Sequence, residues 1–357
     1  MNKKKILLVS PFPNDDDLYP HVRYLINELS VDYDIDYFYG HERGIWTEQF
    51  NNKLKEGNYK PVINILKDLI ALYTKKNQNY KFVLAIDNFL YNISYLIFQK
   101  KTILWSHDFV GYDEKKNQQL VQKNIALITR KTLHKNQKII IQDSERLEAL
   151  LKSISYDGMP NSVFFLPVSL PPIKLQNKYS CESQLPVIMQ SGTIANWRFS
   201  NELIICHQQN LEKFNLFIQG FLTPDIEILL KSLENSPHIN SSRVSPDKLS
   251  EIIQLCDIGF IGYAIADVNH YYISKASGQL VEFIRCGKPV IVKTKTNLQQ
   301  YVEENKIGVA IEDIDELIPA IHKIQNSYQE YSCNCIQLFE RSFNIKKYTE
   351  ELLLFLE

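Results

Sequence analysis

The sequence lacks a long hydrophobic run, since no stretch of about 18 uncharged apolar residues occurs in it. A helix that crosses a bilayer needs about 20 predominantly apolar residues, so we expect no membrane span. Near the start, residues 6–9 form a short apolar stretch between Lys5 and Pro11. A secretion signal needs an apolar region of about 7–15 residues. We therefore expect a cytoplasmic protein.

Several common sequence motifs are also absent. The six cysteines are scattered, apart from Cys333 and Cys335, and none has the paired Cys or His spacing of a zinc site. This pattern predicts free thiols in a reducing compartment. No Gly-x-Gly-x-x-Gly, Walker or Gly-x-Ser-x-Gly motif occurs, which argues against dinucleotide oxidoreductases, ATPases and serine hydrolases.

Neither sign of charge dominates, because 40 Lys and Arg residues face 41 Asp and Glu residues and the net charge is -1. Without a global positive field, nucleic-acid binding would need a local basic patch. The basic and aromatic group at Lys346, Lys347 and Tyr348 is too small for such a module. We therefore expect no nucleic-acid partner.

Short apolar runs alternate with segments of helical spacing along the 357 residues. In the first half, the expected strands are 5–10, 35–39, 82–86, 102–105 and 138–142, and the expected helices are 19–29, 61–73, 90–98, 120–133 and 144–152. In the second half, the expected strands are 187–190, 216–219, 258–261 and 290–292, and the expected helices are 201–208, 224–232, 249–256 and 277–287. Such alternation is typical of parallel β-α-β units, which gives an α/β fold class.

The alternation breaks between Pro167 and Pro186, where prolines and polar residues interrupt every periodic pattern. We interpret this segment as a linker. It predicts two Rossmann-like, doubly wound domains, residues 1–170 and 183–344, because the chain is too long for one ordinary core. The two domains are expected to face each other across a cleft at the carboxyl ends of their sheets.

The most informative segment is residues 277–292, a short helix followed at once by a buried strand. Ser277 can cap the helix, and the free amides of the first turn together with the helix dipole favour a phosphate there. The apolar stripe leaves Gln279 and Glu282 on the other face. Gly287 is the expected helix stop. A core helix that carries a glutamate by chance has the same pattern, so periodicity alone leaves both interpretations open.

Four segments together resemble the GT-B glycosyltransferases, specifically the retaining nucleotide-sugar enzymes related to glycogen and sucrose synthases. They are residues 187–198, residues 216–220 with 249–263, residues 277–292, and residues 104–108 in the first half. The resemblance implies a GT-B fold, a nucleotide-diphosphate sugar as donor and no metal cofactor. It also implies that the last helix, residues 345–357, packs back on the first domain.

The resemblance also implies roles for individual residues. Glu282 matches the closing glutamate of the donor motif and would accept hydrogen bonds from the ribose hydroxyls. Arg198 would neutralise the diphosphate after a turn at Gly192 and Thr193, with the amides from Ser277, Gly278 and Gln279 beside it. His107, at the end of the expected strand 102–105, would meet the donor sugar. Arg198 and His107 are the expected catalytic residues.

Two positions depart from the family pattern. Ser274 stands eight residues before Glu282, where the motif normally opens with a glutamate, so the donor-sugar contacts or the activity would differ. Thr193 stands where a basic residue often follows the loop glycine, and Lys275 could compensate from the donor side. The acidic runs 15–17 and 32–36 resemble metal-binding aspartates of the other glycosyltransferase fold, but we interpret both as structural.

From these residues we expect a glycosyltransferase that moves a hexose-type sugar onto a glycan or lipid-linked acceptor, with the acceptor surface near residues 11–17. Retention of configuration, a place in surface polysaccharide synthesis and peripheral contact with the inner face of the membrane are implied by the resemblance. Two alternatives remain open. One is a nucleotide-sugar epimerase of the same architecture, and the other is a silent partner that binds nucleotide sugar without turnover, which Ser274 favours.

Overall fold

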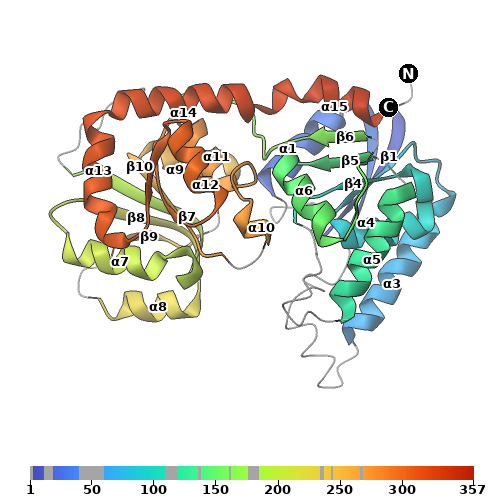
Figure 1. Cartoon of the computed structure of the whole chain (residues 1–357), viewed down its shortest axis with the longest axis horizontal. Coiled ribbons are helices and arrows are strands. Elements are labelled where there is room, and N and C mark those ends of the chain that lie inside the picture. Colours follow the sequence, from blue (N-terminus) through green and yellow to red (C-terminus); the bar gives the residue numbers. More distant parts are fainter. Residues whose placement is uncertain are drawn as a thin grey trace. The chain divides into compact units, whose positions relative to one another are not determined.

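The computed structural model describes residues 3–11, 19–39, 60–108, 120–135, 138–160, 162–175, 185–233, 237–242, 244–265 and 268–357 (Figure 1). The chain forms two compact units. The first contains residues up to Pro167 together with Ile345–Glu357, and the second is Val168–Asn344. The expected acceptor surface near residues 11–17 and the acidic run 15–17 lie almost wholly outside the described residues.

The first unit is built on a six-stranded parallel sheet with the order β2-β1-β3-β4-β5-β6. Its strands are β1 (Lys4–Ser10), β2 (Tyr33–Tyr39), β3 (Val83–Ile86), β4 (Thr102–Trp105), β5 (Lys138–Ile141) and β6 (Ser162–Phe165). The strands β3 and β4 are buried over their whole length, as expected for a sheet that helices cover on both faces.

Helices cover both faces of this sheet. They are α1 (Pro20–Leu29), α3 (Lys60–Thr74), α4 (Asn88–Phe98), α5 (Leu120–Lys135), α6 (Ser144–Ser153) and α15 (Thr349–Leu356), with short 3-10 turns η1 (Lys75–Asn77), η2 (Gln99–Lys101) and η5 (Ile345–Lys347). The helices α1 and α15 share one apolar core with alternate residues of the strands, and Leu352 and Leu356 of α15 lie inside it. The helix α4 packs on β3 and β4 and contacts α3 and α5.

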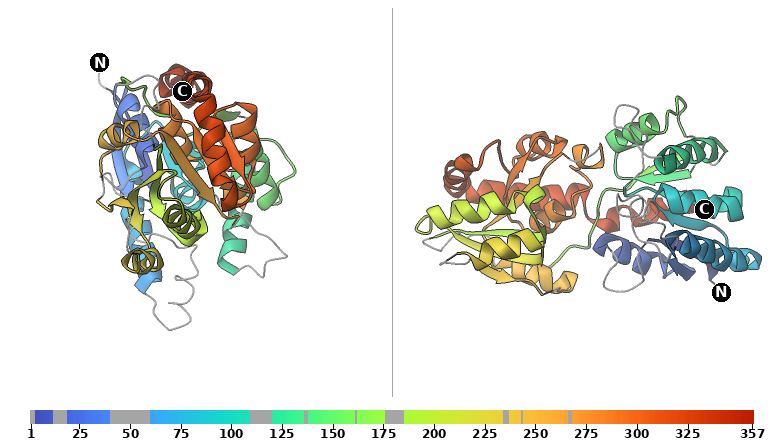
Figure 2. Two further views of the ribbon diagram at one scale, coloured as in Figure 1. Left: turned by 90° about the vertical axis from the view of Figure 1, so that its left-hand side faces the viewer. Right: turned by 90° about the horizontal axis from the view of Figure 1, so that it is seen from below.

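The second unit, coloured from green to red in Figure 2, has its own sheet. This sheet has six strands in the order β12-β11-β10-β7-β8-β9, with parallel pairing between neighbours. Its strands are β7 (Val187–Ile194), β8 (Asn215–Leu222), β9 (His238–Asn240), β10 (Ile258–Tyr263), β11 (Val290–Thr294) and β12 (Gly308–Ile311). Two six-stranded parallel sheets with flanking helices confirm the predicted α/β class.

The helices of the second unit are α7 (Ser200–Gln209), α8 (Pro224–Lys231), α9 (Pro246–Gln254), α10 (Val268–Tyr271), α11 (Gly278–Arg285), α12 (Asn297–Glu304), α13 (Leu317–Asn326) and α14 (Tyr328–Ser342), with turns η3 (Asn196–Arg198) and η4 (Ile314–Glu316). The helices α7, α8 and α13 share the larger apolar core with the sheet. On β10, Phe260 joins this core, whereas Gly259 faces Phe283 of α11. Because strand residues alternate between faces, α11 covers the opposite face.

The predicted turn at Gly192 and Thr193 is wrong, because β7 continues through both residues to Ile194. Gly192 and Thr193 pair with Gly220 and Phe221 of β8 in parallel register. The φ of Gly192 is 87°, a left-handed value that glycine adopts at little cost, so the strand keeps its ladder through a locally unusual backbone. The chain turns only at η3 (Asn196–Arg198), which places Arg198 beyond the strand end.

Candidate functional site

Arg198 lies at the centre of a polar cluster in the second unit. Its guanidinium carbon lies 4.5 Å from the ring centroid of Trp197 and 4.1 Å from that of Tyr263, at the end of β10. Its Nη1 donates a hydrogen bond to Oε1 of Gln279, at 2.9 Å. The Nε of Arg198 is buried and has no hydrogen-bond partner in the part of the chain that the structure describes. The guanidinium is therefore held in place by the two rings and by Gln279, while the N–H of its Nε is unused.

Backbone packing fixes the turn that carries Arg198. A Cβ atom at Gly262 of β10 would lie 2.1 Å from the carbonyl oxygen of Arg198, so only glycine lets the strand approach this closely. The carbonyl of Arg198 accepts a hydrogen bond from Gln190, at 3.0 Å, and the carbonyl of Trp197 accepts one from the amide of Ala264, also at 3.0 Å. The turn is thus tied to both neighbouring strands, β7 and β10.

The first turn of α11 lies beside this cluster. Ser277 caps the helix as predicted, because its Oγ accepts a hydrogen bond from the amide of Leu280, at 3.2 Å, and lies 3.1 Å from Oη of Tyr263. Gln279 also donates from Nε2 to the carbonyl of Ser191 in β7. Gly278 is exposed, and a Cβ built on it would have no atom within 4 Å. The free amides of α11 therefore open onto space next to Arg198, an arrangement that favours an anion.

Glu282 follows one turn later on α11 and is buried, at 6% exposure. Its Oε2 accepts a hydrogen bond from Nη2 of Arg285, at 2.6 Å, whereas its Oε1 is buried without a partner among the described residues. Burial raises the pKa of Glu282, and the charge and hydrogen bond of Arg285 oppose that shift. Arg285 is held in turn by Ser250 and by the carbonyl of Pro171, at 3.3 Å. One carboxylate oxygen is thus engaged and the other is available.

The remaining predicted donor residues are more loosely connected to this cluster. Ser274 is buried, and its amide donates a hydrogen bond to Oδ1 of Asn297, at 3.0 Å. Lys275 is half-buried, and its carbonyl accepts from the amide of Val168, at 3.0 Å. Within the described residues, no side-chain hydrogen bond or ion pair joins Ser274, Lys275 or Thr193 to Arg198 or Glu282. The structure therefore groups Arg198, Gly192, Gln279, Ser277 and Gly278, with Glu282 on the same helix.

His107 belongs to the first unit and lies just after β4. Its Nδ1 is 3.1 Å from Nε2 of His21 on α1, and its ring packs against Trp105, with centroids 4.7 Å apart. The Nε2 of His107 is buried without a partner in the described chain. Burial lowers the pKa of His107 well below its usual value, with further lowering by His21 and Arg146, and burial lowers that of His21 to about 3. Both imidazoles are neutral near pH 7.

Asp87, at the end of β3, supports the backbone around His107. Its Oδ1 accepts hydrogen bonds from the amides of His107 and Asp108, at 3.1 and 3.0 Å. Burial and the charge of Asp108 raise the pKa of Asp87 to about 8, against opposing effects of these amides and Arg146. Arg146 of α6 donates to the carbonyl of His107 and to Asp108, the latter at 3.3 Å.

Sequence reasoning missed His21, Asp87, Arg146 and Tyr263 as neighbours of the candidate residues. Asp87 could have been found, because it follows a predicted strand in the same way as His107 and the ends of parallel strands meet at one sheet edge. His21 and Arg146 come from helices whose facing residues are fixed only by tertiary packing. Asp36, in the acidic run 32–36, lies 3.2 Å from Nζ of Lys5, which agrees with the structural interpretation of that run.

Comparison with known structures defines the class of fold. A sucrose-phosphate synthase from Thermosynechococcus elongatus matches with a TM-score of 0.71 and 14% identity, over 99% of this chain and 98% of that one. Anabaena HepE in complex with UDP and glucose matches with a TM-score of 0.69 and 13% identity, over 99% of both chains. WaaG, a glycosyltransferase involved in lipopolysaccharide biosynthesis, matches with a TM-score of 0.61 and 16% identity, over 97% of this chain and 98% of that one. The chain therefore has the GT-B fold.

A family comparison is more specific for the second half of the chain. Residues 229–355 match the family model described as "Glucosyltransferase 3-like, C-terminal domain". This range contains α11, Ser274 and Glu282, but not Arg198. In a comparison with curated proteins, none matches significantly. Among the described residues, no helix is both long enough and apolar enough to span a membrane.

Proposed function

We propose that the protein is a glycosyltransferase that takes a sugar from a nucleotide-diphosphate donor and attaches it to a glycan or a lipid-linked acceptor. The observation that carries this proposal is the guanidinium of Arg198, fixed between Trp197 and Tyr263 with a buried, unpartnered Nε beside the open first turn of α11. The GT-B fold and the family match of residues 229–355 support it. So do structures of HepE with UDP and with UDP-glucose.

In this proposal, the second unit binds the donor. Arg198 and the amides from Ser277 to Gln279 hold the diphosphate, and the Oε1 of Glu282 accepts hydrogen bonds from ribose hydroxyls. When the bond between the sugar carbon and the diphosphate oxygen breaks, negative charge grows on the diphosphate. A preorganised cation and helix amides stabilise that charge, which is the main electrostatic task of such a transfer. We propose that these residues supply the stabilisation themselves, without a metal cofactor.

The first unit would contribute His107. Because both His107 and His21 are neutral near pH 7, His107 acts in this proposal as a hydrogen-bonding group for the donor sugar and not as a charged one. Its unpartnered Nε2 is the atom available for that bond. We also propose a hexose as the transferred sugar, retention of configuration, and domain boundaries near residues 170 and 183.

A panel of nucleotide sugars, incubated with and without candidate acceptors, tests the proposal. We expect release of nucleoside diphosphate that depends on the acceptor, with Arg198→Ala lowering the rate at least about 100-fold, as loss of a charge-stabilising donor does. A change in the free nucleotide sugar alone would indicate an epimerase instead. Binding without turnover would indicate a silent partner. Ser274 favours this alternative, because it places a hydroxyl where the family motif has an acid for the donor sugar.

The cellular context is also a proposal. We place the protein in the cytoplasm, in the synthesis of a surface polysaccharide, where lipid-linked acceptors are found at the inner face of the membrane. A deletion strain that keeps its full surface polysaccharide would contradict this assignment.

A further inference from the structure

Three helices of the first unit, α3, α4 and α5, lie side by side on one face of its sheet (Figures 1 and 2). The segments 60–77, 88–101 and 120–135, which contain these helices and the turns η1 and η2, carry ten Lys and Arg residues but only one acid, Asp68. Asp68 is buried. The whole chain has a net charge of -1. On this surface, the exposed cations among the described side chains are Lys67, Lys76, Lys100, Lys101, Lys123, Arg130 and Lys131, and Lys75 lies 3.8 Å from Asp36 of β2.

The same surface exposes large apolar side chains. On α3 they are Leu66, Ile70 and Tyr73, which follow one another at the spacing of a single helix face. On α4 the exposed apolar residue is Leu96, and on α5 they are Leu127 and Ile128. These six side chains are between 40% and 67% exposed, and we call them the apolar set. Exposed apolar residues are common singly, but a group on adjacent helices marks an interaction surface.

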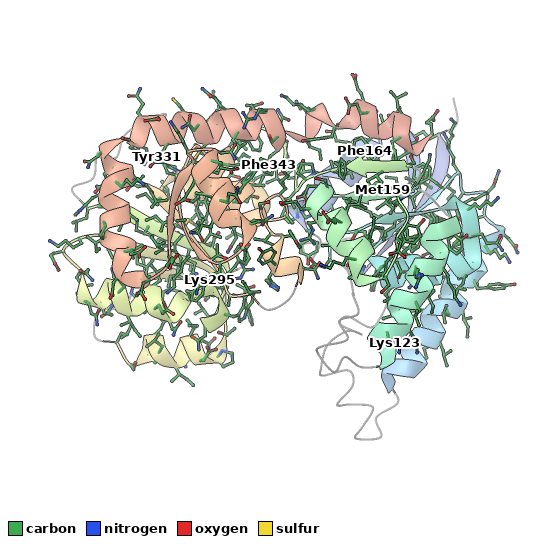
Figure 3. The ribbon with its side chains drawn as sticks, in the orientation of Figure 1. Lys123, Met159, Phe164, Lys295, Tyr331 and Phe343 are labelled. Atoms are coloured by element: carbon green, nitrogen blue, oxygen red, sulfur yellow. The ribbon has the colours of Figure 1, made fainter. Side chains whose placement is uncertain are left out.

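Cations and apolar residues share the same helix faces. On α5, the exposed residues Lys123, Leu127 and Lys131 follow at intervals of four residues, with the exposed Arg130 next to Lys131, and Lys123 is labelled in Figure 3. On α3, Lys67 lies next to Leu66, and the ammonium of Lys76 lies 5.3 Å from the ring centroid of Tyr73. Long cationic side chains that flank exposed apolar residues are typical of helices that lie in a membrane interface.

We propose that this face of α3, α4 and α5 docks on an anionic lipid bilayer. The charge complementarity decides the partner: the exposed apolar set can enter the region between head groups and acyl chains, while the surrounding lysines and arginines attract anionic head groups. The helix α4 begins directly after β3, at the sheet edge that carries Asp87 and His107. A membrane bound at these helices therefore lies on the unit that contributes His107, which suits an acceptor that is itself embedded in lipid.

The test is co-sedimentation of the full chain with vesicles of phosphatidylcholine alone and of phosphatidylcholine with about 30% phosphatidylglycerol. We expect binding to the anionic vesicles that weakens as salt rises, because exposed charges are screened. Each cation near an anionic membrane surface contributes to the free energy of binding. Replacing two of them, in Arg130→Gln/Lys131→Gln, should weaken partitioning into the vesicles about 30-fold. The variant Leu66→Ser/Ile70→Ser should weaken binding to the same vesicles without changing the salt dependence.

Matched controls come from exposed positions in the second unit. Lys231→Gln/Lys323→Gln removes two exposed cations, and Ile228→Ser/Leu255→Ser removes two apolar residues that are 70% and 79% exposed. Both control variants should bind anionic vesicles as the unmodified chain does. The proposal is overturned by absence of vesicle binding, by equal binding to neutral and anionic vesicles, or by controls as damaging as the test variants. Capture of an acidic protein in the absence of vesicle binding would assign the surface to that partner instead.

Discussion

The ion pair between Glu282 and Arg285 makes a sharp prediction about the proposed donor site. Arg285→Met removes the charge and hydrogen bond that hold one oxygen of Glu282 while filling much of the same space. The charged groups that act on Glu282 are then reduced to Asp247 of α9, whose charge raises the pKa of Glu282 as burial does. In the variant the pKa of Glu282 should therefore rise further, and a larger share of the carboxyl groups should be protonated at a given pH.

The size of the effect follows from the two hydrogen bonds that ribose hydroxyls would donate to Glu282. A hydrogen bond to a charged acceptor contributes about 1 kcal/mol more than one to a neutral acceptor. Loss of the charge should therefore cost about 2 kcal/mol, which is about a 30-fold rise in the dissociation constant of UDP. The affinity should recover as pH is raised, because the carboxyl group ionises again.

Isothermal titration of the full chain with UDP between pH 7 and 9 measures this effect. Arg285→Lys keeps the charge and should show a smaller change than Arg285→Met. The double variant Glu282→Gln/Arg285→Met has no carboxyl group to titrate, so its UDP affinity should be low and independent of pH. If Arg285→Met binds UDP as tightly as the unmodified chain at every pH, Arg285 is not needed to keep Glu282 ionised for the ligand. Tighter binding would show that Arg285 sequesters Glu282.

Three further predictions concern other parts of the two units. Gly262→Ala should lower the free energy of unfolding by at least about 2 kcal/mol in urea denaturation, because its Cβ would lie 2.1 Å from the carbonyl oxygen of Arg198; an unchanged midpoint would refute the close approach. Asp87→Asn keeps the oxygen that accepts hydrogen bonds from the amides of His107 and Asp108. The melting temperature of this variant, relative to that of the unmodified chain, should rise from pH 5 to pH 8.5. The sign follows because the pKa of Asp87 is raised to about 8, so stability falls as pH rises through the range between its unfolded and folded values; a constant difference would contradict this. His21→Ala should lower kcat more than it raises KM while His21→Gln restores part of kcat, since a side-chain amide can replace the bond to His107; equal loss in both variants would indicate a purely structural role.

The fold was predictable because its signals are local. Strands such as β4 and β11 are short, largely apolar runs. The helix cap at Ser277 is a hydrogen bond from the amide of Leu280, three residues further along, to the Ser277 hydroxyl. The edge strands β6, β9 and β12 were not predicted. In β6 and β9, polar residues such as Ser162 and Asn240 weaken the apolar pattern. The turn at Gly192 was misplaced because glycine suggests a turn, whereas here its left-handed φ is accommodated inside a strand.

The candidate site was predictable only in part. Arg198 and Glu282 could be chosen from their places after a strand and on a capped helix, but most of their immediate partners could not. Arg285 follows Glu282 at the i,i+3 spacing of one helix, so this pair could have been predicted. The contact of Arg285 with Ser250 on α9 and the stacking of Tyr263 on Arg198 could not. Such contacts depend on tertiary packing between segments far apart in the sequence, and no local pattern records them.

The measurement that tests the central claim most directly is calorimetric titration of the full chain with UDP and with uridine. The account predicts that UDP binds at least about 10-fold more tightly than uridine, because Arg198 and the first turn of α11 bind the diphosphate. Arg198→Ala should remove most of that difference and leave the weak affinity for uridine unchanged. Equal affinities for UDP and uridine, or an Arg198→Ala variant that binds UDP as the unmodified chain does, would contradict the assignment of the diphosphate site.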